Sequence, residues 1–373
     1  MTTQTSILSK VLSWMPRFVL WLVLIVVILL AIGYIYQRRT TAADFEQVPP
    51  PGQRVDVGGY SLHIYCTGEV EGPTVVVDAG AGDFSTSWQG IQPEVAKSVR
   101  ICTYDRAGYG WSDVSPHPRT ATQMSKELHQ LLVNAKIEPP YILVGHSLGG
   151  FTVRVFASQY PDEVAGMILV DSGHEDQLER LPPEYLRLYK QQQSYFSVMG
   201  FMARFGILRM IGSSSIGKDF APPQVAKMPK DVQPVYLMMI SHPSFFDTML
   251  AELRALPEIS AEVRATGKLG DMPLFILSAD MPDEAALQSI GLGDDFPAAE
   301  LQQTFNDLQT EFESLSTNST HIFVKDSTHA INLDQPQSVI KAILGVVAMT
   351  RYIKTNLAGR DLNLYQIRTS HIF

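Results

Sequence analysis

Residues 141–150 read Tyr-Ile-Leu-Val-Gly-His-Ser-Leu-Gly-Gly, and this stretch decides the fold. Its first four residues are typical of a buried strand, and a helical pattern follows at Gly150–Tyr160. The Gly-x-Ser-x-Gly between them fits a sharp strand-to-helix turn, in which small flanking residues let Ser147 adopt strained backbone angles and raise its hydroxyl above the sheet. The helix N-terminus favours developing negative charge there. We therefore expect Ser147 to be a nucleophile.

Short β-branched runs alternate with longer helical patterns over most of the chain, which predicts an α/β fold with a mostly parallel sheet covered by helices on both faces. Eight strands are predicted, at Arg54–Val57, Leu62–Cys66, Thr74–Val77, Arg100–Tyr104, Tyr141–Val144, Met167–Val170, Leu274–Leu277 and His321–Val324. The interval His174–Lys268 interrupts the alternation with helical patterns rich in Met, Phe, Tyr and Leu. This interval is expected to form a helical cap over the sheet.

A run of nineteen uncharged residues, Phe18–Tyr36, lies near the amino terminus. As a helix rising about 1.5 Å per residue it is about 28 Å long, close to the ~30 Å hydrocarbon core of a bilayer. The run is longer than the apolar region of a signal peptide, which is the alternative interpretation, and Arg38 and Arg39 follow it. We therefore expect a single-pass transmembrane helix. A slight excess of positive charge before it favours a catalytic body outside the cytoplasm.

The composition excludes several other classes of protein. Hydrophobic residues make up 45% of the 373 residues and charged residues 18%, which is not the composition of a disordered chain. The formal net charge of −9 offers no basic face for phosphates, so no nucleic-acid partner is expected. No His-Glu-x-x-His or Cys-x-x-Cys spacing occurs. We therefore expect neither a metal nor a cofactor.

Two more motifs follow predicted strands, namely Asp78-Ala-Gly-Ala-Gly82 and Tyr104-Asp-Arg-Ala-Gly-Tyr-Gly-Trp-Ser112. With the serine motif, in this order, they make residues 54–350 resemble the α/β-hydrolase superfamily. The resemblance implies an α/β-hydrolase fold with a helical cap. It also implies an oxyanion hole formed by the amide of Leu148 and by an amide of the glycine turn, either Ala81 or Gly82. The choice is open because Ala79 stands where the family usually has histidine.

The family's chain order of nucleophile, acid and histidine implies the remaining catalytic residues. His329 follows the last predicted strand, where the family places its general base. The acid is open between Asp280, which follows Leu274–Leu277, and Asp171, which follows Met167–Val170; Asp283 is a weaker third candidate. Each of these aspartates also suits a turn or a helix N-cap.

These features predict a membrane-anchored serine hydrolase that cleaves small-molecule carboxylic esters, with apolar acyl groups, through an acyl-enzyme. Acyl transfer on the same triad and a non-catalytic binding protein are the alternatives. In the superfamily the strands that carry Cys66 and Cys102 are neighbours, so either a disulfide or two buried thiols is expected. The predicted segments are a tail at 1–17, a transmembrane helix at 18–36, a linker at 37–52, the core at 53–173 and 269–350, the cap at 174–268, and a tail at 351–373.

Overall fold

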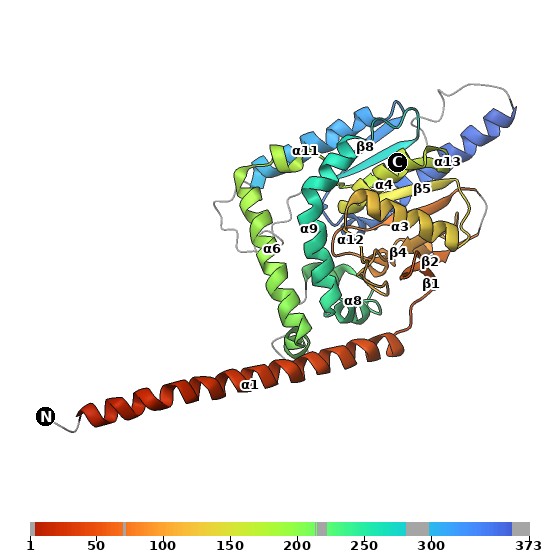
Figure 1. The fold of residues 1–373 in the computed structure, drawn as a ribbon. Coiled ribbons are helices and arrows are strands. Elements are labelled where there is room, and N and C mark those ends of the chain that lie inside the picture. The colour runs from red at the N-terminus through yellow and green to blue at the C-terminus, as the bar shows by residue number, and fades with distance from the viewer. Residues whose placement is uncertain (1–3, 70–71, 213, 215–221, 281–297, 360–373) are drawn as a thin grey trace.

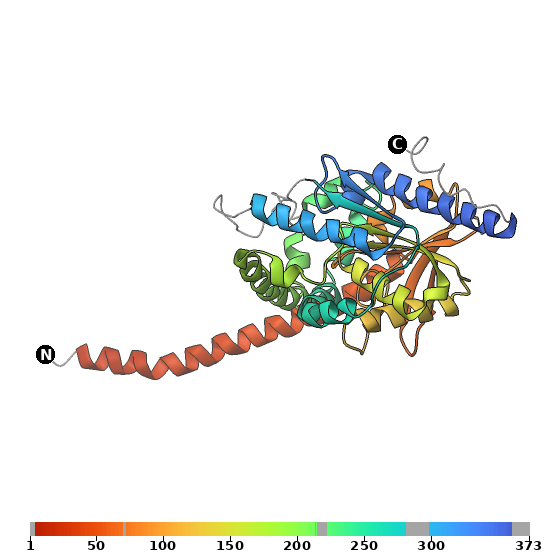
Figure 2. The same cartoon turned by 90° about the horizontal axis from the view of Figure 1, so that it is seen from above.

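The computed structural model describes residues 4–69, 72–212, 214, 222–280 and 298–359, with side chains of residues 14–352 within those ranges. Figures 1 and 2 show a sheet with helices on both faces, a group of cap helices beside it, and one long helix that projects from the body. This arrangement follows the alternation of strand and helix patterns along the chain.

The sheet has eight strands in the order β1-β2-β4-β3-β5-β6-β7-β8. The pairs β1–β2 and β2–β4 are antiparallel and all other neighbours are parallel, which confirms the predicted α/β fold with a mostly parallel sheet. The strands are β1 (Gln53–Asp56), β2 (Ser61–Thr67), β3 (Thr74–Asp78), β4 (Ile101–Tyr104), β5 (Tyr141–His146), β6 (Val164–Val170), β7 (Leu274–Ala279) and β8 (Ser319–Val324).

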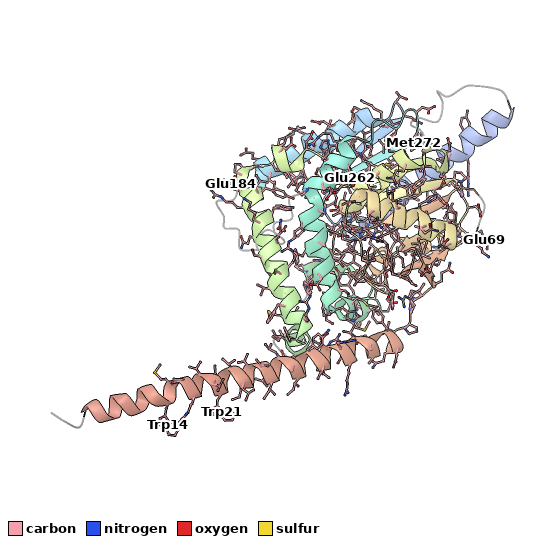
Figure 3. All side chains as sticks on the ribbon, viewed as in Figure 1. Trp14, Trp21, Glu69, Glu184, Glu262 and Met272 are labelled. Carbon is pink, nitrogen blue, oxygen red and sulfur yellow. A yellow bond between two sulfur atoms is a disulfide. The ribbon has the colours of Figure 1, made fainter. Side chains whose placement is uncertain are left out.

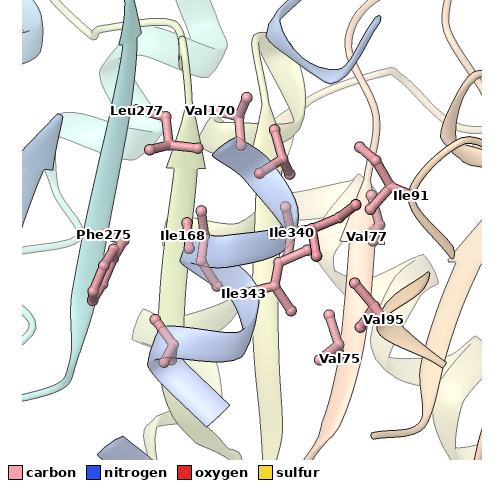
Figure 4. Close-up of a cluster of buried hydrophobic side chains, with 14 of the residues drawn as sticks. Val75, Val77, Ile91, Val95, Ile168, Val170, Phe275, Leu277, Ile340 and Ile343 are labelled. Carbon is pink, nitrogen blue, oxygen red and sulfur yellow. The ribbon is translucent and has the colours of Figure 1, made fainter. Parts of the chain in front are cut away.

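Alternate residues of the central strands pack on opposite faces of the sheet. In β3, Val75 and Val77 lie in one buried cluster and Val76 lies in the other. The first cluster includes Ile340 and Ile343 of a terminal helix that crosses this face (Figure 4). Because both faces are buried, the strands are continuous apolar runs instead of alternating polar and apolar residues.

Helices cover each face of the sheet. The first face carries α2 (Gln92–Val95) and α13 (Pro336–Gly359), and the second carries α3 (Ala121–Asn134) and α4 (Leu148–Gln159). Further elements of the core are η1 (Ser85–Trp88), η2 (Pro161–Glu163), α11 (Ala298–Glu311), η5 (Phe312–Leu315) and α12 (Ile331–Asp334). Thr120 caps α3 by accepting a hydrogen bond from the amide of Gln123 at 3.3 Å.

The cap consists of α5 (Gln177–Arg180), α6 (Pro183–Arg204), α7 (Ile207–Gly212), η4 (Pro223–Lys227), α8 (Gln233–Met239) and α9 (Pro243–Arg264). A proline begins α6 and α9, where a missing amide hydrogen costs no intrahelical bond. The two long helices pack on each other, and Ile259 and Val263 of α9 pack on α3 and α4. The cap is therefore joined to the core through α9.

The first helix, α1 (Gln4–Gln47), is much longer than the predicted transmembrane segment 18–36. The segment 14–47 is long and apolar enough to cross a membrane by length and composition, and its 18-residue apolar window has no buried residues. The predicted linker 37–52 is wrong for residues 37–47. They remain helical because Gln37 and Asp44 are buried against the cap, so the linker is confined to 48–52.

The carboxyl-terminal prediction also changes. The tail predicted at 351–373 begins inside α13, which extends to Gly359 and so continues the helix expected at Pro336–Thr350. Residues 360–373 lie outside the described part of the chain.

Cys66 and Cys102 form a disulfide with a Cα–Cα distance of 4.0 Å. They face each other in register on the antiparallel strands β2 and β4. Of the two alternatives that the sequence left open, the structure has the disulfide. It closes a 36-residue interval of the chain.

We expect replacement of both cysteines by alanine to destabilise the fold, because a cross-link over an interval of this length restricts the unfolded chain and contributes about 2–4 kcal/mol. The midpoint of thermal unfolding of the detergent-solubilised protein should fall by several degrees, and reductant should shift the wild type but not the variant. Two reactive thiols in denatured, non-reduced wild type would contradict the disulfide.

Candidate active site

The turn between β5 and α4 carries Ser147, with φ 51° and ψ −119°. This is a left-handed backbone conformation that a non-glycine residue rarely adopts. Three backbone hydrogen bonds hold the residue there: its amide donates to the carbonyl of Val170 at 3.1 Å, and its carbonyl accepts from the amides of Gly150 at 3.1 Å and Gly173 at 3.0 Å. The strain is thus maintained by the neighbouring strand and by the first turn of the helix.

Two glycines of the serine motif are required by close packing. A Cβ on Gly145 would lie 2.6 Å from the Cα of Gly150, and a Cβ on Gly149 would overlap the carbonyl oxygen of Asp78. Any side chain at either position would push the helix away from the strand ends. The glycines therefore let α4 begin directly beside β3 and β5, with Ser147 at the top of the turn.

Ser147, His329 and Asp171 form one hydrogen-bonded chain. Nε2 of His329 lies 2.9 Å from Oγ of Ser147, and its Nδ1 lies 2.6 Å from Oδ2 of Asp171. The His329 side chain is 51% exposed and that of Asp171 is 18% exposed. With Nδ1–H donating to the carboxylate, Nε2 is left as the acceptor for the serine proton. This is the geometry of a nucleophile, a general base and an orienting acid.

Of the two main sequence candidates for the acid, the structure brings Asp171 to the imidazole. β6 lies between β5 and β7 in the sheet, so the residue after β6 is next to the serine turn. The amide of Ala279 also donates to Oδ1 of Asp171 at 2.9 Å and fixes the carboxylate.

Asp280 was an equal candidate, and its position is different. It lies one strand further from the serine, after β7, and its Oδ1 accepts from the amide of Ser327 at 3.3 Å. Asp280 thus supports the loop that carries His329 instead of contacting the Nδ1 of that histidine. The weaker candidate, Asp283, lies outside the described residues.

His146, the residue before the serine, also supports the loop of His329. Its Nε2 lies 3.0 Å from the carbonyl oxygen of His329, and the two rings are 5.0 Å apart. Burial, together with the neighbouring His329, lowers the pKa of His146 to about 4. The ring is therefore neutral at ordinary pH and donates Nε2–H to that carbonyl. The sequence had given His146 no role.

The predicted oxyanion-hole amides lie beside the serine. A Cβ on Gly80 would be 3.2 Å from the Cβ of Ser147, so the turn 79–82 passes directly next to Ser147. The amide of Gly82 is already engaged, because it donates to the hydroxyl of Tyr109 at 3.1 Å. Within the described part of the chain, the amides of Ala81 and Leu148 donate to no backbone acceptor. The sequence left Ala81 and Gly82 as alternatives for the oxyanion-hole amide of this turn. Of the two, only the amide of Ala81 is not engaged by Tyr109.

Arg106 holds this turn in place. Its guanidinium donates to the carbonyl oxygens of Ala79 and, at 2.7 Å, Gly80. It also pairs with Asp78 at 2.7 Å and with Glu252 of the cap helix α9 at 2.9 Å. Burial opposes the charge of Arg106, but the two carboxylates outweigh it and hold the pKa of the guanidinium well above its ordinary value.

The same network reaches the other end of the turn. The hydroxyl of Tyr109 donates to Glu252 at 2.7 Å while accepting from the amide of Gly82. The turn is therefore held at its carbonyls by Arg106 and at one amide by Tyr109. Arg106 and Tyr109 lie in the motif 104–112 that the sequence singled out, but no sequence signal linked them to Glu252, 143 residues or more away.

Ser147 and His329 open into a cavity of about 1140 Å³ between the sheet and the cap. This volume is slightly above the range of about 300–1,000 Å³ that is usual for small-molecule sites. Among the described residues, five methionines line it, namely Met199, Met202, Met228, Met238 and Met249. Such flexible, polarizable side chains give an adaptable apolar wall. The apolar cap patterns that the sequence showed thus contribute to a pocket as well as to packing.

One carboxyl group in this cavity was missed by the sequence reasoning. Asp83 lines the cavity next to the turn 79–82. Burial raises its pKa to about 6, although Ser87 and the amide of Phe84 stabilise its charged form. No local motif marks Asp83, because its environment is created by the cap.

Comparisons with known proteins agree with this architecture. Residues 73–197 match the family model described as alpha/beta hydrolase fold. The chain is 28% identical over 290 residues to the uncharacterized protein YqjL of Bacillus subtilis, covering 78% of this chain and 89% of that protein.

Two fungal relatives match over shorter stretches. An AB hydrolase superfamily protein of Gibberella zeae is 35% identical over 107 residues, which cover 28% of this chain and 33% of that protein. An uncharacterized vacuolar membrane protein of Saccharomyces cerevisiae is 35% identical over 136 residues, which cover 32% of this chain and 21% of that protein. The matched region therefore spans a third or less of these two relatives.

Solved structures share the fold. Cfl2 from Burkholderia cenocepacia has a TM-score of 0.56 at 22% identity, covering 79% of this chain and 95% of that chain. Epoxide hydrolase CorEH has a TM-score of 0.57 at 18% identity, covering 80% and 98%. With the family match over residues 73–197 and the sheet order, they show that the chain has the α/β-hydrolase fold.

We expect Asp83→Asn to stabilise the protein at neutral pH. The folded-state pKa of about 6 lies above the ordinary 3.8, so the wild type loses stability as pH rises from about 4 through 6, whereas asparagine does not titrate. Because one pKa unit corresponds to about 1.36 kcal/mol, the gain should be about 3 kcal/mol at pH 7.5 and close to zero at pH 4. Thermal unfolding of both forms at the two pH values checks this, and a pH-independent difference would contradict the assigned pKa.

Proposed function

We propose that this protein is a membrane-anchored serine hydrolase that cleaves carboxylic esters with apolar acyl groups. The observation that carries the proposal is the hydrogen-bonded chain from Asp171 through His329 to Ser147, which ends in a largely apolar cavity. A base is in reach of the hydroxyl, and the acid fixes the tautomer of that base.

In the proposed reaction, Oγ of Ser147 attacks the ester carbonyl while Nε2 of His329 takes its proton. The Asp171 carboxylate stabilises the resulting imidazolium. Collapse of the tetrahedral intermediate transfers that proton to the leaving alcohol and leaves an acyl-serine. His329 then deprotonates a water that attacks the acyl-serine, and the second collapse releases the acid and regenerates the serine.

The negative charge that develops on the carbonyl oxygen needs donors that are already in position. We assign this role to the amides of Ala81 and Leu148. Leu148 is the first residue of α4, where an amide has no partner within the helix. Because Arg106 and Tyr109 fix the turn of Ala81 in advance, little reorganisation is needed in the transition state.

A serine nucleophile favours acyl substrates over alkyl substrates such as epoxides. Attack of Ser147 on an epoxide carbon would form an ether, which lacks a carbonyl for water to attack, so the enzyme would not turn over. Attack on an ester forms a new ester, which the same base and oxyanion hole can hydrolyse. Likeness to an epoxide hydrolase at 18% identity therefore concerns the fold and not the reaction.

The anchor is α1, whose exposed apolar side chains extend from Trp14 to Tyr36. A helix of this kind is stable only where lipid or protein covers it. We place the catalytic body outside the cytoplasm, which the disulfide Cys66–Cys102 supports, because such bonds persist in oxidising compartments.

The test of the chemistry is labelling with a fluorophosphonate, which requires an activated serine. We expect one adduct, located by mass spectrometry on Ser147 and absent from Ser147→Ala. A screen of p-nitrophenyl esters should then show turnover that rises with acyl length. A folded wild type that neither reacts with the probe nor hydrolyses any ester would contradict the proposal.

The identity of the acid gives a matched pair of variants. Asp171→Asn should lower kcat by about 10²- to 10⁴-fold, because an amide cannot hold His329 in the required tautomer. Asp280→Asn keeps an acceptor for the Ser327 amide and should leave kcat close to wild type. The measurement is steady-state hydrolysis of one ester by both variants. The reverse order of effects would show that Asp280 is the acid.

A further inference from the structure

The end of the cap helix α6 is packed directly on α1. A Cβ on Gly33 would overlap the carbonyl oxygen of Phe205, and the rings of Tyr34 and Phe205 are 6.5 Å apart. A Cβ on Gly206 would lie 2.9 Å from the ring of Tyr36. Glycine on both sides thus allows the two backbones to approach closely.

A buried polar cluster fixes the relative position of α1 and the cap. Asp44 of α1 pairs with Arg209 of α7 at 2.6 Å and with His242 at 2.9 Å. The amide side chain of Gln37 donates to the carbonyl of Ser241 at 3.2 Å. Because Gln37, Asp44 and His242 are buried and Arg209 is mostly so, and all are held by hydrogen bonds, we treat α1 and the cap as one rigid unit.

The contacts of Gly33 and Tyr34 with Phe205 place the carboxyl-terminal end of α6 (its tip) beside the apolar run of α1. Gly33 precedes Arg38 by five residues, which is about 7.5 Å along a helix. If the charged Arg38 lies at the membrane surface, Phe205 lies beside the last apolar turn of the span. Figure 3 shows Trp14 and Trp21 on the projecting part of α1, and Glu184 at the other end of α6.

The tip of α6 carries exposed apolar side chains at helical spacing. Tyr195, Val198 and Phe201 are 48%, 56% and 49% exposed, and the ring of Phe201 lies 4.8 Å from that of Phe205. In Figures 1 and 2, α6 is on the side of the body that faces the projecting half of α1. An apolar stripe on this side faces the bilayer that α1 would cross.

The active-site cavity reaches the same surface. Tyr195 and Leu237 line the cavity and are also exposed, so they mark its mouth. Leu208 and Ile211 of α7, next to the junction with α1, line the cavity as well. An apolar passage therefore connects the cap surface near α1 with Ser147.

We propose that the tip of α6 sits in the membrane surface and that the cavity mouth receives its substrate from the bilayer, which makes the substrate a long-chain lipid ester. The inference rests on the proposed function for its catalytic part. The insertion of Val198 and Phe201 into lipid (the seating of the cap) is independent of catalysis. It is inferred from the contacts of α1 with the cap.

The seating is tested by fluorescence quenching. Phe201→Cys and, as the control, Val133→Cys of α3 are labelled with an environment-sensitive fluorophore without reductant, so that Cys66 and Cys102 stay in their disulfide. The full chain is reconstituted in phosphatidylcholine vesicles that contain nitroxide-labelled lipids. We expect strong quenching at position 201 and only background at position 133. Background at 201, or equal quenching at both positions, would overturn the proposal.

Delivery from the bilayer is tested with two substrates. Val198→Ser/Phe201→Ser is compared with Val114→Ser/Val133→Ser, which changes exposed valines elsewhere on the body. The cap variant should lose about tenfold or more of its rate on a long-chain monoacylglycerol in vesicles, because apolar contact drives interfacial binding. It should hydrolyse soluble p-nitrophenyl butyrate within about twofold of wild type, and the control should match wild type on both substrates.

The outcomes separate the two proposals. An equal loss on both substrates by a folded cap variant, or no loss on either, would overturn delivery from the bilayer. A wild type that hydrolyses neither substrate would contradict the proposed function, and quenching at position 201 would then still support the seating of the cap.

Discussion

A single buried cation, the guanidinium of Arg106, connects the three parts on which the site depends. It forms an ion pair with Asp78 at the end of β3 and another with Glu252 of the cap. It also donates hydrogen bonds to the carbonyls of Ala79 and Gly80, in the turn beside Ser147. A buried charge is costly unless it is fully paired, so these partners hold one arrangement together. The turn 79–82, the cap helix α9 and the end of β3 are therefore not independent, and the position of α9 bears directly on the proposed oxyanion hole.

The fold was largely predictable because its signals are local. Both faces of the sheet are buried, so the strands are short apolar runs, and each of the eight predicted ranges overlaps an observed strand. The serine turn is a ten-residue pattern, and its glycines are fixed by contacts that a Cβ would break. The extent of α1 was not predictable. Residues 37–47 are polar enough for a linker and are helical because the cap buries Gln37 and Asp44.

The site was predictable only where chain order decides it. Ser147 and His329 follow from their motifs, but Asp171 and Asp280 both follow parallel strands. The choice between them depends on which strand lies next to β5 in the sheet. It also depends on how the loop after β8, which carries His329, crosses the carboxyl ends of the strands. Arg106 with Glu252, and the neutral His146, depend on contacts between distant segments. Asp83 owes its pKa to burial beneath the cap.

The rigid attachment of α1 to the cap has a mechanical consequence. A helix that spans a bilayer adjusts its tilt when the thickness of the hydrocarbon changes. Because Asp44, Arg209 and His242 join the helix to the cap in one buried cluster, a change of tilt would turn the cap and the cavity mouth with it. In the proposed membrane-anchored arrangement, the thickness of the bilayer would then alter the position of the cavity mouth without any ligand.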